Sequence, residues 1–216
     1  MGKKASHYLP FVLILVFGIE FVILGIQPHD RYDWLLENFL VLMFVLFIGI
    51  LWIRKIHHFS NTSWIAITLF LLIHEIGAHY TYSEVPYRDF FVRYLHVDVH
   101  LLLGWERNHF DRIVHFLFGL LLFIPMYELC KAFLNVQRYW IGLITFSFIL
   151  CLSTLYELLE WAAALVFGGE LGMAYLGTQG DIWDAHKDML LAIIGAGIAW
   201  CLFILRKKVV LDSNTV

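Results

Sequence analysis

The sequence predicts an all-α, polytopic membrane protein, a bundle of about six transmembrane helices with both termini in the cytoplasm. Of its 216 residues, 61% are hydrophobic and only 15% are charged, whereas soluble domains contain roughly 45–50% apolar and about 25% charged residues. The apolar residues form runs of about 20, the length that crosses a ~30 Å hydrocarbon core. Because these runs are too long for barrel strands and a backbone in lipid must satisfy its own hydrogen bonds, we expect helices.

Six stretches are long and apolar enough to be spans. We place them at about 8–27, 34–53, 62–82, 112–134, 139–167 and 185–205. No small-residue cleavage site follows the first stretch, so we interpret it as a span and not as a signal peptide. We find no Ser-, Pro- or Gly-rich linker and no internal repeat, and we therefore interpret residues 1–216 as a single integral-membrane domain.

The distribution of Lys and Arg predicts the orientation of the bundle. The connections on the side of the termini are almost purely basic, as at residues 54–55 and 206–208. Basic residues on the other side are mixed with many acids, so the positive-inside rule places both termini in the cytoplasm. The chain has no basic patch with interleaved aromatic residues, which argues against nucleic-acid binding.

Two longer connections are expected outside the cytoplasm. Within the first, the apolar run at 87–105 is too short and too charged to span the membrane. We expect it to be an interfacial or re-entrant segment that carries an aromatic belt. The second connection, residues 168–184, is rich in glycine, and we expect an irregular loop there.

Acids and histidines gather in one layer of the predicted bundle. The direction of each span converts sequence position into depth, and spans one, three, four, five and six each place such residues in their outer part. Pairs spaced three or four residues apart share one helix face. These pairs are Glu75 and His79, Asp111 and His115, Glu157 and Glu160, and Asp184 and Asp188. Since a carboxylate that faces lipid costs several kcal/mol, we expect these residues to face the bundle interior and to mark a site.

Carboxylates and imidazoles without a thiolate suit a hard or borderline divalent metal ion, such as zinc, manganese or iron. The three cysteines lie in apolar segments and form no CxxC pair. The predicted metal ligands are His79, His115, Glu157, Glu160 and Asp111. The predicted catalytic residues are Glu75, as general base or a further ligand, and Asp184 and Asp188, behind the ligands or at a second metal. HEIGAH is not the HExxH motif, because its second histidine follows the first by five residues.

Simpler interpretations stay open for several of these residues. Asp181, Asp184 and other polar groups near a span end are also typical of the membrane interface. Glu20 can be a protonated acid bonded to a neighbouring helix. His74 can serve packing or lie behind the ligands, because it lies about 100° around its helix from Glu75. Asp111 can simply stabilise the N-terminus of its helix.

Four blocks resemble, in order, the bacterial YjdF-type inner-membrane family, which has no assigned reaction. The blocks are HEIGAHYTYSEVP, NHFDRIVHFLFG, YELLEW and GTQGDIWDAHKDM. The resemblance covers nearly the whole chain and implies a six-span protein of the inner membrane. A more distant similarity is to VanZ-like teicoplanin-resistance proteins and implies a role in the cell envelope. The residues that carry it are Asp111, Arg112, His115, Glu157 or Glu160, Asp181, Asp184 and Asp188, before Gly195 and Gly197.

The leading functional hypothesis is a metal-dependent hydrolase of the bacterial inner (cytoplasmic) membrane. It would act on a lipid or lipid-linked envelope substrate at the extracytoplasmic side, with membrane lipid as its partner. One alternative is a transporter or proton-coupled carrier, since intramembrane acids and histidines also build proton relays. The nearly uncharged cytoplasmic halves of the spans argue against such a relay. A third possibility is a non-enzymatic envelope protein that binds a lipid-linked precursor, and the sequence indicates no oligomeric state.

Overall fold

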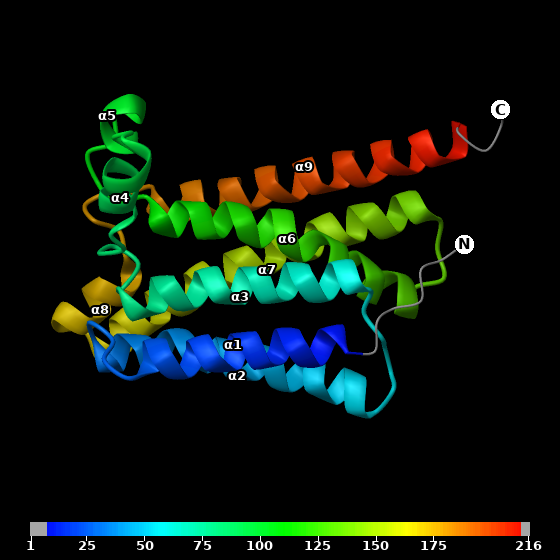
Figure 1. Cartoon of the computed structure of the whole chain (residues 1–216), viewed down its shortest axis with the longest axis horizontal. Helices are drawn as coiled ribbons and strands as arrows, with labels where there is room; N and C mark the ends of the chain where they lie inside the picture. The colour runs from blue at the N-terminus through cyan, green and yellow to red at the C-terminus, as the bar shows by residue number, and fades with distance from the viewer. Residues whose placement is uncertain (1–7, 213–216) are drawn as a thin grey trace.

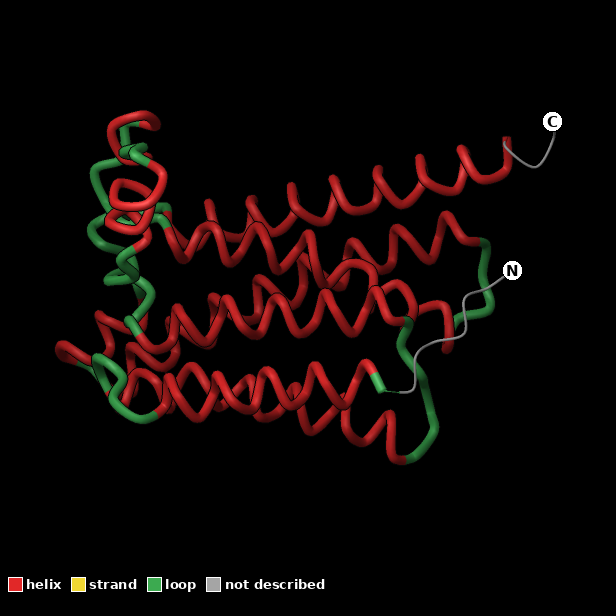
Figure 2. Tube along the Cα trace, in the orientation of Figure 1, coloured by secondary structure: helices red, strands yellow, loops and turns green. Residues whose placement is uncertain are grey.

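Every regular element in the computed structural model, which describes residues 8–212, is helical (Figure 2). The long helices lie side by side, with loops and short helices gathered at the two ends of the bundle (Figure 1). They are α1 (Leu9–Gly25), α2 (Arg31–Ile53), α3 (Asn61–His79), α6 (Phe110–Phe133), α7 (Arg138–Phe167) and α9 (Asp184–Asp212). Five of them are long and apolar enough to cross a membrane, and α1 is apolar but somewhat shorter, with 17 residues. The predicted all-α membrane bundle is confirmed.

The helices begin and end within about three residues of the predicted bounds, except that α9 continues past residue 205 to Asp212. The first residue of α1 and the last of α9 lie at the same end of the bundle (Figure 1). The opposite end carries the short helices α4 (Tyr87–Phe90), α5 (Val99–Leu103) and α8 (Gly169–Leu176). The charge distribution predicts that this end faces away from the cytoplasm, and it is called the outer end below.

Polar caps define where the second and third helices start. The Asp30 side chain accepts hydrogen bonds from the backbone N–H groups of Tyr32 (2.7 Å) and Asp33 (3.0 Å) at the start of α2. The Ser60 hydroxyl accepts one from Ser63 at the start of α3. Such caps satisfy N–H groups that have no partner within the helix. The Ser60 N–H itself donates to the Glu128 carboxylate at 2.9 Å, which holds the α2–α3 connection against α6.

The connection between α3 and α6 forms short helical pieces instead of a span. They are α4 (Tyr87–Phe90), a π-helical turn (η1, Phe91–Leu95) and α5 (Val99–Leu103), and they lie at the outer end (Figure 1). Asp98 caps α5 and pairs with Arg88 at 2.7 Å, and this pairing lowers the pKa of Asp98 to about 2. Leu101 and Leu102 are exposed, which is typical of a segment at a lipid interface.

The expectation of an irregular loop at 168–184 is wrong for its first half, which forms helix α8 (Gly169–Leu176). Gly168 and Gly169 have positive φ angles of 58° and 55°, a conformation that ends α7 and turns the chain back. Gly172 then lets α8 lie against α7, because an added Cβ would be 2.8 Å from the Ala164 carbonyl oxygen. These glycines therefore serve a turn and a close contact between helices, and not flexibility.

Helices α6 and α9 form the closest helix pair of the bundle. A Cβ added at Gly119 of α6 would be 1.9 Å from the carbonyl oxygen of Ala192, and one at Gly195 of α9 would be 2.1 Å from that of Phe116. Small residues at such contacts let helix backbones approach closely in a membrane, where packing and not the hydrophobic effect holds helices together. This contact fixes the start of α9 beside the start of α6.

Replacing Gly119 by valine is therefore expected to destabilise the bundle. The added atoms would have to push backbone apart, so we expect a loss of about 3 kcal/mol or more, at the upper end of overpacking costs. The thermal unfolding midpoint of the detergent-purified protein measures this. Gly49→Val on α2 is the control, because no atom lies within 4 Å of a Cβ added at Gly49. Equal midpoints for the two variants would contradict the close contact.

Candidate functional site

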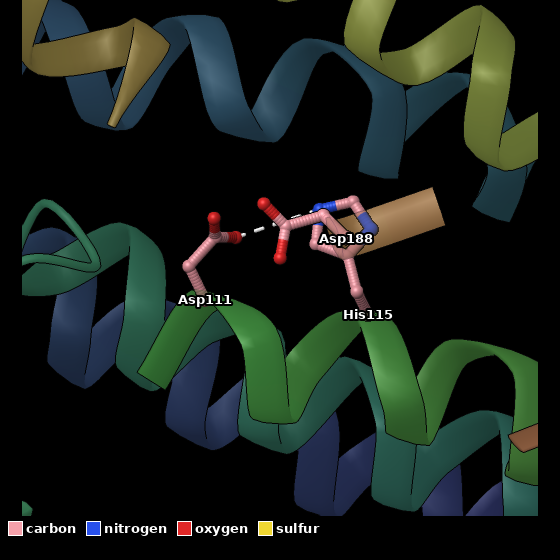
Figure 3. Close-up of side chains that lie close together, drawn as sticks. All are labelled: Asp111, His115 and Asp188. Carbon is pink, nitrogen blue, oxygen red and sulfur yellow. Dashed lines mark ion pairs between the residues drawn. The ribbon is translucent and has the colours of Figure 1, made fainter. Parts of the chain in front are cut away.

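Three side chains from the outer ends of α6 and α9 point toward one another (Figure 3). Asp111 and His115 are one turn apart on α6, and the His115 Nε2 atom lies 3.5 Å from Asp111 Oδ1. Asp188 reaches the same space from α9, so that one donor atom of each residue lies within 4.8 Å of the others. This grouping is a candidate metal centre, and its residues are called the triad below.

Helix α7 adds two buried carboxylates beside the triad. Glu157 Oε1 is 3.3 Å from the Nε2 atom of His115, and Glu160 is buried three residues further along the same helix. The contact with His115 lacks hydrogen-bond geometry, so Glu157 Oε1 has no hydrogen-bond partner among the described residues. Asp188 Oδ1, on a side chain only 2% exposed, has none either. Buried oxygens without a partner are costly, and a cation among them would remove that cost.

An ion-pair network at the mouth of α9 separates two of its acids from the triad. The Arg112 guanidinium lies 2.5 Å from Asp181 and 2.8 Å from Asp184. Arg107 also pairs with Asp184, and Lys187 pairs with Asp181 at 2.5 Å. These hydrogen bonds, chiefly that of Lys187, hold the pKa of Asp181 well below its usual range. The positive charges of Arg107 and Arg112 balance the charge of the Asp184 carboxylate.

The triad residue Asp188 is much less well paired than Asp184. Its closest approach to Arg112 is 3.9 Å, longer than a hydrogen bond. The structure thus gives different surroundings to two acids that the sequence placed together. Asp184 holds the arginines behind the site, and Asp188 faces into it.

The structure does not bring Glu75 and His79 to the triad. The His79 ring is hydrogen-bonded to the Leu24 carbonyl oxygen of α1 at 2.7 Å. Glu75 is fully buried, and the Trp34 and Asn38 side chains of α2 come close to it without reaching hydrogen-bond geometry. Helix α3 turns these residues toward α1 and α2, because it packs between α1 and α6.

His74, for which the sequence suggested packing or a place behind the ligands, lies on the triad side of α3. It accepts or donates a 2.5 Å hydrogen bond with the Tyr82 hydroxyl, and both residues line the same cavity as Asp111 and His115. Neighbouring residues on a helix differ by about 100° in direction, so His74 lies on the triad side of α3 while Glu75 lies on the side of α2. The rotation of α3 decides which of the two faces the site, and sequence spacing does not fix that rotation.

Helix α2 carries two buried acids and a buried amide that the sequence analysis missed. Asp33, Glu37 and Asn38 are each at most 3% exposed. The Tyr156 hydroxyl of α7 donates a 2.8 Å hydrogen bond to Glu37. The signal was present in the sequence, since Asp33 and Glu37 are four residues apart at the outer end of the second span. All six long helices therefore place ionisable side chains in the outer part of the bundle.

Residues 9–208 match a family described as predicted membrane protein, DUF2238. The chain belongs to this family. It is also 32% identical over 189 residues to the inner membrane protein YjdF of Escherichia coli (strain K12), an alignment that covers 87% of this chain and 82% of that protein. The chain is thus a multi-pass protein of the bacterial inner membrane, as its sequence predicted. No solved structure matches it, and the similarity to VanZ-like proteins stays a prediction.

The neutral state of His109, just before α6, leads to a prediction about pH. Burial, with the nearby charges of Arg112 and Arg107, lowers the pKa of His109 from 6.5 to about 4. The unfolded chain therefore binds a proton at a higher pH than the folded protein, and stability is lost as pH falls from about 6.5 toward 4. The thermal midpoint of the wild-type protein is expected to fall between about pH 7.5 and about pH 5 more than that of His109→Gln. An identical fall in both proteins would contradict this role of His109.

Proposed function

We propose that the protein is a metal-dependent hydrolase that acts on a lipid or lipid-linked envelope substrate at the outer face of the inner membrane. Asp111, His115 and Asp188 would hold one divalent cation. The observation that carries the proposal is the convergence of three donor atoms within 4.8 Å in a buried part of the bundle. Membrane position limits the substrate to molecules that reach this depth, of which lipids are the main class.

The donor chemistry fits a catalytic metal. Two carboxylates and one imidazole resemble the ligand sets of zinc, manganese and non-haem iron sites. Three protein ligands leave at least one coordination position free for water or substrate, as catalytic sites require. The Asp188 Oδ1 atom has no hydrogen-bond partner among the described residues and is available as a ligand. Lipid surroundings strengthen the argument, because an unpaired carboxylate is most costly there.

A bound metal would polarise a carbonyl or phosphoryl oxygen and lower the pKa of a bound water. Glu157 would accept a proton from that water, because its Oε1 atom has no hydrogen-bond partner among the described residues and lies 3.3 Å from the Nε2 atom of His115. The water oxygen would bond to the acyl carbon or phosphorus while the bond to the leaving oxygen breaks. The proton held by Glu157 would then pass to the leaving oxygen, so that each cycle consumes one water. Glu160 and Arg112 would support this geometry from the flanks.

One observation favours a second candidate, a proton-coupled carrier. Further buried acids lie on the α1–α2–α3 side, among them Asp33, Glu37 and Glu75. A single metal ion held by the triad does not require them as ligands. Intramembrane acids of this kind often bind protons. However, the inner part of the central cavity is lined by apolar side chains, so no described polar path continues toward the cytoplasmic end. The hydrolase therefore accounts for more of the structure.

Metal binding is tested by a matched pair of substitutions. Asp188→Asn is expected to lower the affinity for zinc or manganese at least about tenfold. Loss of a group that only orients a ligand typically lowers metal affinity ~10–100-fold, and loss of a ligand itself is expected to cost at least as much. Asp33→Asn is the control, since Asp33 is equally buried but lies with Glu37 on α2. Elemental analysis and calorimetric titration of the purified proteins provide the measurement. Equal affinities in both variants, or no metal bound by the wild type, would refute the metal site.

Hydrolysis itself is tested with Glu157→Gln. This variant is expected to retain the metal and to lose the conversion of inner-membrane lipid extract, which mass spectrometry of the products follows. The amide keeps the size of the carboxylate and is cheaper to bury, so the fold is expected to survive. Wild-type protein that binds metal but converts no component of the extract would favour the carrier.

A further inference from the structure

A long cavity of about 290 Å³ runs inside the bundle between α2, α3, α6 and α7. On α6 its lining extends from Asp111 to Leu129, which corresponds to roughly 27 Å at ~1.5 Å per residue. Its inner end is formed by Phe59 and Leu129 and is purely apolar. Its polar lining residues, apart from Ser153, lie toward the outer end. They are His74, Tyr82, Asp111, His115 and Tyr156.

The cavity opens sideways, between α2 and α7. These two helices do not pack along each other, and the lining residues Phe47, Leu152 and Leu155 are exposed at the mouth. The hydrogen bond from Tyr156 to Glu37 bridges α2 and α7 above the mouth. Since both helices are membrane spans, the mouth faces the hydrocarbon of the bilayer. A water-soluble ligand has no direct route to this opening, whereas a lipid does.

Ser153 marks the place where the polar part of a ligand would begin. It lies one turn from Glu157 on α7, lines the cavity and is 2% exposed. Its hydroxyl oxygen has no hydrogen-bond partner among the described residues. A buried hydroxyl without a partner costs roughly 1–3 kcal/mol, and an oxygen of a ligand head group would remove that cost.

We propose that this cavity binds one long hydrocarbon chain of a lipid, with its head group at Ser153, His115 and Asp111. The volume is at the lower end of the ~300–1,000 Å³ typical of ligand sites, so it suits one chain and not the two of a phospholipid. The lining from His115 to Leu129 is roughly 21 Å long at ~1.5 Å per residue, which is the length of one extended acyl chain. The ligand class is therefore a lipid with a single chain, such as a lysophospholipid. This inference rests on the proposed function, for which it names the substrate class.

The test uses lysophosphatidylethanolamine with a photoreactive group at the end of its acyl chain. The protein is reconstituted in phosphatidylethanolamine–phosphatidylglycerol vesicles with a chelator present, so that binding is measured without metal. Cross-links are expected at the inner end of the cavity, near Phe59 and Leu129. A phosphatidylethanolamine probe with the same group on one acyl chain is expected to label this end at least about tenfold less, or roughly 1.4 kcal/mol.

Two substitutions on α7 provide the control. Leu152→Trp places a large ring at the mouth and is expected to reduce deep labelling about tenfold, or roughly 1.4 kcal/mol. Leu158→Trp, on an exposed residue that does not line the cavity, is expected to leave labelling unchanged. Equal labelling in the two variants, or cross-links confined to the outer surface of the bundle, would overturn the chain site.

The chain site and the metal site can fail separately. Asp188→Asn is expected to label like the wild type, because the apolar lining holds the chain without metal. If the wild type binds metal but shows no deep labelling, the chain site is refuted and the metal site stands. Deep labelling in a protein that binds no metal would support the chain site and refute the hydrolase.

Discussion

The close contact between α6 and α9 is the constraint on which the rest of the structure depends. Gly119 and Gly195 let the two backbones touch, so that the outer turns of both helices share one small volume. Asp111, Arg112 and His115 of α6 then lie beside the acids at the start of α9. In a bilayer, where hydrophobic burial does not drive helices together, such backbone contact is the simplest way to fix a polar site.

Ion pairing then distinguishes the acids of that site from one another. The three basic residues at the mouth of α9 pair with Asp181 and Asp184, and none of them forms a close pair with Asp188. The carboxylates of Asp111 on α6 and Glu157 on α7 both lie close to the Nε2 atom of His115. Unpaired charge is costly in this environment, and a divalent cation would offset the charge that the basic residues of the chain leave unpaired. The apolar cavity that begins at this point joins the polar layer to the hydrocarbon of the membrane.

The sequence allowed the fold to be predicted nearly completely, because long apolar runs in lipid permit only helices. It also placed Asp111, His115, Glu157 and Asp188 correctly in one buried layer, through their spacing and the direction of each span. It did not assign the right face of α3, because helical spacing sets angles within one helix and leaves its rotation against neighbours open. It also overlooked Glu37, which lies within a strongly apolar run and is recognisable only through its spacing from Asp33. The pairing of Arg112 with Asp184 could likewise not be predicted, since it depends on how α6 and α9 lie relative to each other.

The central claim is that His115, and not His79, belongs to a metal centre. Pulsed electron paramagnetic resonance of the protein loaded with Mn²⁺ tests it directly, since an imidazole ligand gives a nitrogen coupling to the metal. We expect a coupling from one imidazole that disappears in His115→Gln and is retained in His79→Gln. A coupling that persists in His115→Gln, or one that is lost only in His79→Gln, would contradict it.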